Sequence, residues 1–96
     1  MKMTQLLYFK TVAEDGRISV AAKKLFVTAP AVSIAITNLE KELGVQLFDR
    51  IKNRLILNEY GVAYLQYVNR VFDDLSQASK IVRGMKPETD APENQA

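Results

Sequence analysis

The sequence contains no cysteine, no histidine and no tryptophan. The lack of cysteine excludes a disulfide framework, a thiolate nucleophile and a thiolate-ligated metal site. The lack of histidine removes the commonest general base and metal ligand. A carboxylate pair, a glycine-rich phosphate loop and a nucleophile elbow are missing as well. We therefore expect no enzymatic activity, no metal and no cofactor in this chain.

Long apolar runs are also missing. No segment approaches the roughly 20 apolar residues of a membrane helix, and the patch at residues 6–9 is too short for the core of a signal peptide. We therefore expect the protein in the cytoplasm. Only four glycines and three prolines can form turns, and 48% of the 96 residues are hydrophobic. This composition favours one small, mainly helical domain.

The formal net charge is only +2, but the acidic groups are concentrated at one end. Residues 85–96 carry Glu88, Asp90 and Glu93 against Lys86, so the rest of the chain is more basic than the total suggests. Such a bias fits a polyanionic partner, and it equally fits an ordinary solvated surface.

Two helices and a tight turn are expected in the first 28 residues. Thr4 is a suitable N-cap for the first helix, and Gly16 is suited to end it. Ser19 is a suitable N-cap for a short second helix over residues 20–25. Residues 26–28 then form a turn of about three residues, the length found between the helices of a helix-turn-helix.

A third helix is expected over about residues 29–43, with Thr28 as N-cap, Pro30 in its first turn and Gly44 at its end. Its apolar stripe consists of Val32, Ile36, Leu39 and Leu43. The opposite face carries Pro30, Ile34, Thr37, Asn38 and Lys41, with Ser33 on its flank. An amphipathic helix of any small bundle has the same periodicity, but the short second helix and tight turn favour DNA binding.

Residues 49–51 and 55–57 are expected to pair as two short strands around a tip at residues 52–54. Asn53 in that tip suits a positive φ. Arg50, Lys52 and Arg54 lie in and around the tip, so the hairpin is either a wing that clamps phosphates or a surface hairpin with solvated charges.

A long helix is expected from Asn58, its N-cap, to about residue 84, with Gly61 requiring close packing to offset its cost. Two overlapping apolar stripes run along it, one through Leu65, Val68, Phe72, Leu75, Ser79 and Val82, the other through Tyr64, Val68, Val71, Leu75, Ala78 and Val82. Either one stripe packs on the domain and the other on a partner helix, or both fold back on one domain. Residues 85–96 have the composition of a disordered tail or linker.

Residues 3 to about 84 resemble, without gaps, the N-terminal domain of LysR-type transcriptional regulators. The matching residues are Leu6, Tyr8, Phe9, Val12, Ala13, Glu14, Gly16, Ala21, Ala22, Leu25, Val27, Pro30, Ala31, Val32, Ser33, Ile36, Leu39, Glu40, Leu43, Gly44, Val45, Leu47, Phe48, Arg50, Leu57, Glu59 and Gly61. The resemblance implies a mainly α winged helix-turn-helix, with three helices and a two-stranded wing at residues 1–58. It also implies a dimerising linker helix at 59–84 that pairs antiparallel with its partner.

The resemblance further implies a homodimer on a pseudo-palindromic, double-stranded DNA site, with tetramers possible in a full-length protein. Full members add a C-terminal domain that senses a small-molecule effector. An effector would bind that domain, which residues 1–96 do not include. The chain is then either an excised domain or a short relative.

The departures from the family concern the reading helix. The family usually has glutamine at the position of Ala29, and often a basic or polar residue at Ile34 and Thr37. Ala29 cannot hydrogen-bond a base edge, and Ile34 can only pack, for instance on a thymine methyl. Candidate DNA contacts are Thr28, Ala29, Pro30, Ser33, Ile34, Thr37, Asn38, Arg50, Lys52, Asn53 and Arg54. Candidate dimerisation residues are Tyr64, Leu65, Val68, Val71, Phe72, Leu75, Ser79 and Val82.

A weakly charged reading helix leaves one alternative function open. The same fold with an apolar face at Ala29, Ile34 and Ala35 suits a protein-interaction module. The basic hairpin and the residues that match the family favour DNA.

Overall fold

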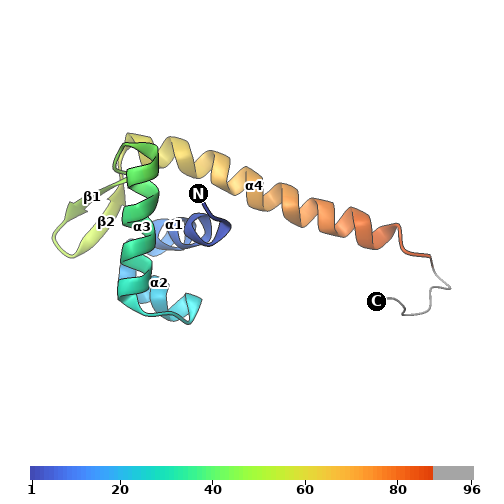
Figure 1. The fold of residues 1–96 in the computed structure, drawn as a ribbon, viewed down its shortest axis with the longest axis horizontal. Coiled ribbons are helices and arrows are strands. Elements are labelled where there is room, and N and C mark those ends of the chain that lie inside the picture. The colour runs from blue at the N-terminus through green and yellow to red at the C-terminus, as the bar shows by residue number, and fades with distance from the viewer. Residues whose placement is uncertain (88–96) are drawn as a thin grey trace.

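The structure, a computed structural model, describes residues 1–87. Its elements are α1 (Met3–Asp15), α2 (Ile18–Leu25), α3 (Ala29–Leu43), β1 (Phe48–Ile51), β2 (Arg54–Leu57) and α4 (Glu59–Gly84). Helices α1, α2 and α3 pack together, the β1–β2 hairpin projects to one side, and α4 runs away from this body (Figure 1). The predicted mainly α fold, with a two-stranded wing and a long last helix, is confirmed.

Helix ends were predicted better at the C-termini than at the N-termini. Gly16 and Gly44 end α1 and α3 in the left-handed conformation, with φ of 72° and 76°. The Thr28 hydroxyl oxygen accepts a hydrogen bond from the Ala31 amide at 3.2 Å, as expected of an N-cap. The N-caps predicted for α1 and α2, however, were wrong.

The first two helices begin two residues earlier than predicted. The N-cap of α1 is Lys2, not Thr4, because the Gln5 side chain accepts from the Lys2 amide at 2.8 Å. The N-cap of α2 is Arg17, not Ser19. Starting α2 at Ile18 allows that side chain to pack against the core, which a helix beginning at residue 20 would not.

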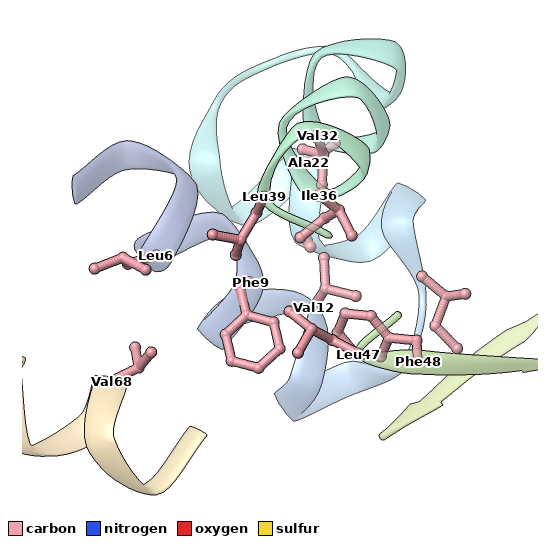
Figure 2. Close-up of a cluster of buried hydrophobic side chains, with 12 residues drawn as sticks. Leu6, Phe9, Val12, Ala22, Val32, Ile36, Leu39, Leu47, Phe48 and Val68 are labelled. Carbon is pink, nitrogen blue, oxygen red and sulfur yellow. The ribbon is translucent and has the colours of Figure 1, made fainter. Parts of the chain in front are cut away.

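The core is centred on Phe9, which is fully buried (Figure 2). Its ring lies 5.5 Å from that of Phe48 and 5.6 Å from that of Tyr64, measured between centroids. Phe9 therefore joins α1 to the first strand and to α4. The predicted α3 stripe is also confirmed, because Val32, Ile36 and Leu39 are buried in the same cluster.

The hairpin is a regular antiparallel pair, with Phe48 opposite Leu57 and Ile51 opposite Arg54. Its turn is therefore the two residues Lys52 and Asn53, and Arg54 belongs to β2 rather than to a three-residue tip. The positive φ falls on Lys52, at 57°, and not on Asn53. A two-residue turn that follows the twist of the strands needs this conformation at its first position.

Only the first half of α4 packs on the domain. The Asn58 side chain caps the helix by accepting from the Gly61 amide at 2.9 Å, as predicted. Val68 is buried, whereas every described residue after Phe72 is exposed. The Lys10 ammonium donates to the Asn69 side-chain oxygen at 3.0 Å and so ties α4 to α1. Most of the tail predicted at 85–96, residues 88–96, lies outside the described residues.

Phe26 occupies an unfavourable position in the turn between α2 and α3. Its φ is 58° and its side chain is 94% exposed. A bulky residue pays a steric cost of roughly 1–2 kcal/mol in the left-handed region, which asparagine tolerates much better. We expect Phe26→Asn to raise the melting temperature by roughly 4–8 °C in thermal unfolding. Phe26→Ala, which keeps a Cβ there but removes the ring, is the control, and an equal rise in both would contradict this explanation.

Candidate nucleic-acid interface

The outward face of α3 is exposed and almost free of charge. Pro30, Ile34, Thr37, Asn38 and Lys41 are exposed and Ser33 is half-buried. Val32, Ile36 and Leu39 are spaced by four and three residues, which places them on one buried face of α3. The exposed residues lie on the opposite face and point away from the core. The structure therefore brings the predicted reading residues together on one face. Ala29 is the exception, because it packs partly against the core.

A basic groove of about 490 Å³ lies between the N-terminal end of α2 and the wing. It is lined by Arg17, Ile18, Ser19, Arg50, Lys52, Asn53, Arg54 and Leu55. Four of these side chains are cationic, and none is acidic. Such a groove suits a strand of phosphates. Arg17 and Ser19 were not predicted as part of the site; the only sequence signal was an arginine directly after the helix-ending Gly16.

Arg50 links this groove to α3. A second groove, of about 330 Å³, lies between α3 and β1, and its lining includes Arg50 together with Thr37 and Glu40. Glu40 is engaged within the fold, since its carboxylate accepts from the Leu47 amide at 2.8 Å. Arg50 therefore lies both in the basic groove and at the border of the outward face of α3.

Arg54 holds the wing against the helices. Its guanidinium donates to the Asp15 carbonyl oxygen at 3.3 Å, and the neighbouring Leu55 amide donates to the Gly16 carbonyl oxygen at 2.8 Å. The Asp15 carboxylate lies 2.8 Å from the Lys24 ammonium, and this hydrogen bond raises the pKa of Lys24. Arg54, predicted as a phosphate clamp, is thus also a positioning residue. This long-range contact left no local signal in the sequence.

Three other predicted DNA-contacting residues can still donate hydrogen bonds. The Thr28 hydroxyl oxygen accepts the capping hydrogen bond of α3, so its proton remains available to donate to a phosphate oxygen. Lys52 and Asn53 form the exposed tip of the wing. All three lie at ends or turns of elements, where an extended backbone such as a DNA strand can reach them.

The predicted dimerisation residues fall into two groups along α4: those in its first half pack on the domain, and those in its second half are exposed. Tyr64, Leu65, Val68 and Phe72 pack on the chain's own core. Val71, Leu75 and Val82 are exposed, as are Ala78 and Ser79. Both predicted stripes therefore begin in the core and end in solvent, because the body of the domain is shorter than α4. Exposed Ile81 and Met85, which the prediction omitted, widen the apolar surface.

An apolar groove of about 300 Å³ continues this surface toward the domain. It is lined by Leu43, Val45, Leu47, Tyr60, Ala63, Tyr64 and Tyr67. The Arg70 guanidinium lies 5.0 Å from the centre of the Tyr67 ring, which orients that ring. Tyr60 and Tyr67 were not predicted as site residues, although they fall on the same helical face as Tyr64 and Val71.

The part of the chain that the structure describes also bears on metal sites and membrane spans. Within residues 1–87, no group of three or more histidine, cysteine, aspartate or glutamate side chains is placed to hold a metal ion. No single helix in that range is long and apolar enough to cross a membrane, and α2 with α3 reach that length only as a pair bent by 107°.

Three helices with a tight turn between the second and third, followed by a two-stranded wing, define a winged helix-turn-helix. Residues 3–62 match the model of the family described as bacterial regulatory helix-turn-helix protein, lysR family. The chain therefore belongs to the LysR family, as the sequence resemblance indicated.

Curated relatives cover most of this chain. An uncharacterized HTH-type transcriptional regulator, YybE of Bacillus subtilis (strain 168), is 37% identical over 89 residues, which is 92% of this chain and 30% of the relative. A probable RuBisCO transcriptional regulator of Guillardia theta is 34% identical over 84 residues, 88% of this chain and 27% of the relative. The chain thus spans less than a third of the length of these relatives.

Solved structures with similar folds include complexes with DNA. The CbnR_DBD–DNA complex is 33% identical, with a TM-score of 0.81 over 88% of this chain and 97% of that one. The BenM_DBD/benA site 1 DNA complex is 30% identical, with a TM-score of 0.84 over 88% and 99%.

Proposed function

We propose that this chain binds double-stranded DNA in a sequence-dependent manner, as the DNA-reading domain of a LysR-type transcription regulator. Helix α3 enters a major groove, and the wing contacts the flanking backbone or minor groove. The proposal assigns binding, not catalysis, to a member of a regulatory family. It places the protein in the cytoplasm with its DNA.

One observation carries the proposal. Arg50 lies both at the border of the exposed α3 face and in the basic groove. The face suited to base edges therefore adjoins the groove suited to phosphates. Phosphate contacts fix the register of a protein on DNA, and contacts to base edges supply the sequence preference. Both the CbnR and BenM structures that resemble this chain contain DNA.

We further propose that two copies pair through α4 and so present two α3 helices to a pseudo-palindromic site. The exposed apolar residues from Val71 to Met85 need a cover that the described part of the chain does not supply. Antiparallel pairing would bring Arg83, near the C-terminal end of one α4, toward Glu59 at the N-terminal end of the other. Tetramers and effector binding belong to the longer protein, if one contains this chain.

Fluorescence anisotropy with a mixed-sequence duplex of about 30 base pairs, titrated across salt, tests the DNA proposal. We expect binding whose logarithmic affinity falls linearly with the logarithm of salt concentration. Selection from a random pool should then yield a two-part site with half-sites separated by whole helical turns, about 34 Å or a multiple. Failure to bind at low salt, both as the chain and as a covalently linked dimer, would point to a protein partner for the apolar α3 face.

The pairing of α4 predicts that Leu75→Asp weakens self-association. Leu75 is 52% exposed in the middle of the apolar surface of α4. Two buried carboxylates at a symmetric interface should raise the dimer dissociation constant at least about tenfold. Sedimentation equilibrium over a concentration series measures this constant.

Gln66→Asp is the matched control, because Gln66 is exposed and lies nine residues from Leu75, on the opposite side of α4. It adds the same charge to the same helix and should leave the dissociation constant unchanged. Equal effects of the two substitutions would assign self-association to another surface.

A further inference from the structure

The centre of the α3 outward face is an isoleucine, not a polar residue. Ile34 is 60% exposed. Its helical neighbours on that face are Pro30, Thr37 and Asn38, with Ser33 on the flank. Residues 29–39 carry no charged side chain. This stretch of α3 therefore lacks the arginine or lysine that makes the commonest specific contact to guanine in a major groove.

A single exposed isoleucine is ordinary on a protein surface and by itself indicates nothing. Its position makes it informative. Thr37, one turn further along α3, lines the groove between α3 and β1 together with Arg50. Arg50 also lines the basic groove. In the proposed complex, phosphates held by these cations would place the base edges of the major groove against the α3 face and so bury Ile34.

The major groove offers one apolar group to such a side chain. Thymine carries a methyl group at C5, whereas the other edges present hydrogen-bond donors and acceptors. An isoleucine placed against those polar groups would remove water from them without replacing its hydrogen bonds. 5-Methylcytosine presents the same methyl group at the same carbon.

We propose that Ile34 reads the C5-methyl group of one pyrimidine in each half-site. The chain then prefers thymine over uracil at that position, and 5-methylcytosine over cytosine. This inference rests on the proposed DNA binding and names the base chemistry that α3 selects. It makes the affinity for an operator responsive to cytosine methylation where the contacted base is cytosine.

The test begins with a duplex selected from a random pool and replaces its thymines by uracil, one at a time. We expect one position in each half-site where the loss of the methyl group weakens binding about fourfold, equivalent to about 0.8 kcal/mol. Replacing the contacted thymine in both half-sites should multiply the two losses of affinity. Placing cytosine and then 5-methylcytosine at that position should give tighter binding for the methylated base.

Ile34→Ala should bind the thymine and uracil duplexes equally, because the contact is gone. The substitution is on the surface and leaves the core intact, and circular dichroism checks the fold. Thr37→Ala is the matched control on the same face, and it should keep the thymine preference of the original chain.

Two results would overturn the inference: equal binding of all uracil-substituted duplexes by the original chain, or a thymine preference that survives Ile34→Ala. In both cases salt-dependent DNA binding persists, so the proposed function stands. Absence of any DNA binding would instead remove the proposed function and this inference with it. The substitutions in the duplex leave the protein untouched, so a misfolded variant cannot obscure the result.

Discussion

Replacing Gly61 with alanine is expected to lower the free energy of unfolding by about 3 kcal/mol. A Cβ at this position would lie 2.1 Å from the Leu47 carbonyl oxygen and 2.6 Å from a methyl carbon of Leu57. The first of these atoms is backbone and cannot rotate away. The Leu47 oxygen also accepts from the Asn58 amide at 3.1 Å, so moving it disturbs the start of α4.

Thermal unfolding measures this loss, which corresponds to a fall in melting temperature of roughly 12–24 °C for a domain of this size. Gly84→Ala is the matched control in the same helix, since its added Cβ would meet no described heavy atom within 4 Å apart from its chain neighbours and the helix backbone. That substitution should be neutral or stabilise by up to about 1 kcal/mol through helix propensity. Similar melting temperatures for the two variants would show that the contact at Gly61 yields easily.

The sequence predicted the elements whose determinants are local. The α3 stripe of Val32, Ile36 and Leu39 was recognised by its spacing, and the structure buries all three. Thr28 and Asn58 were recognised as caps from their side chains and from the pattern that follows them. Gly61 was flagged as a position that requires close packing, and Leu47 and Leu57 supply that packing.

Features that depend on distant contacts escaped prediction. Helix α2 begins at Ile18 because that residue packs on the core, which outweighs the better capping side chain of Ser19. The wing turn places its positive φ on Lys52 because the register Ile51 to Arg54 leaves only two residues in the turn. Neither the core contact nor the register can be read from the residues of one segment.

The same distinction applies to the site. The reading face of α3 follows from helical periodicity, so its members were found from sequence. Arg17 and Ser19 join the basic groove only because α2 packs beside the wing, which periodicity does not show. The division of the apolar surface along α4 depends on where the body of the domain ends, near Phe72, and this is a property of the folded chain.

Removing two cations of the basic groove is expected to weaken DNA binding strongly. We expect the double substitution Arg50→Ala/Lys52→Ala to weaken DNA binding by roughly 10- to 100-fold at 0.1 M salt, and to reduce the slope of log affinity against log salt by about 2. Each side chain lines the groove and is exposed, so each can neutralise one phosphate and release its counterions. Anisotropy titrations at four or five salt concentrations give both the affinity and the slope.

Lys2→Ala/Lys80→Ala is the charge-matched control, because it removes two positive charges from exposed residues that do not line the groove. An effect of net charge alone would lower the affinity equally in both variants, whereas phosphate contacts in the groove lower it only in the first. The loss should also be the same on selected and mixed-sequence duplexes, since phosphates carry no sequence information. A loss confined to the selected duplex, with the salt slope unchanged, would mean that Arg50 or Lys52 reads a base edge instead.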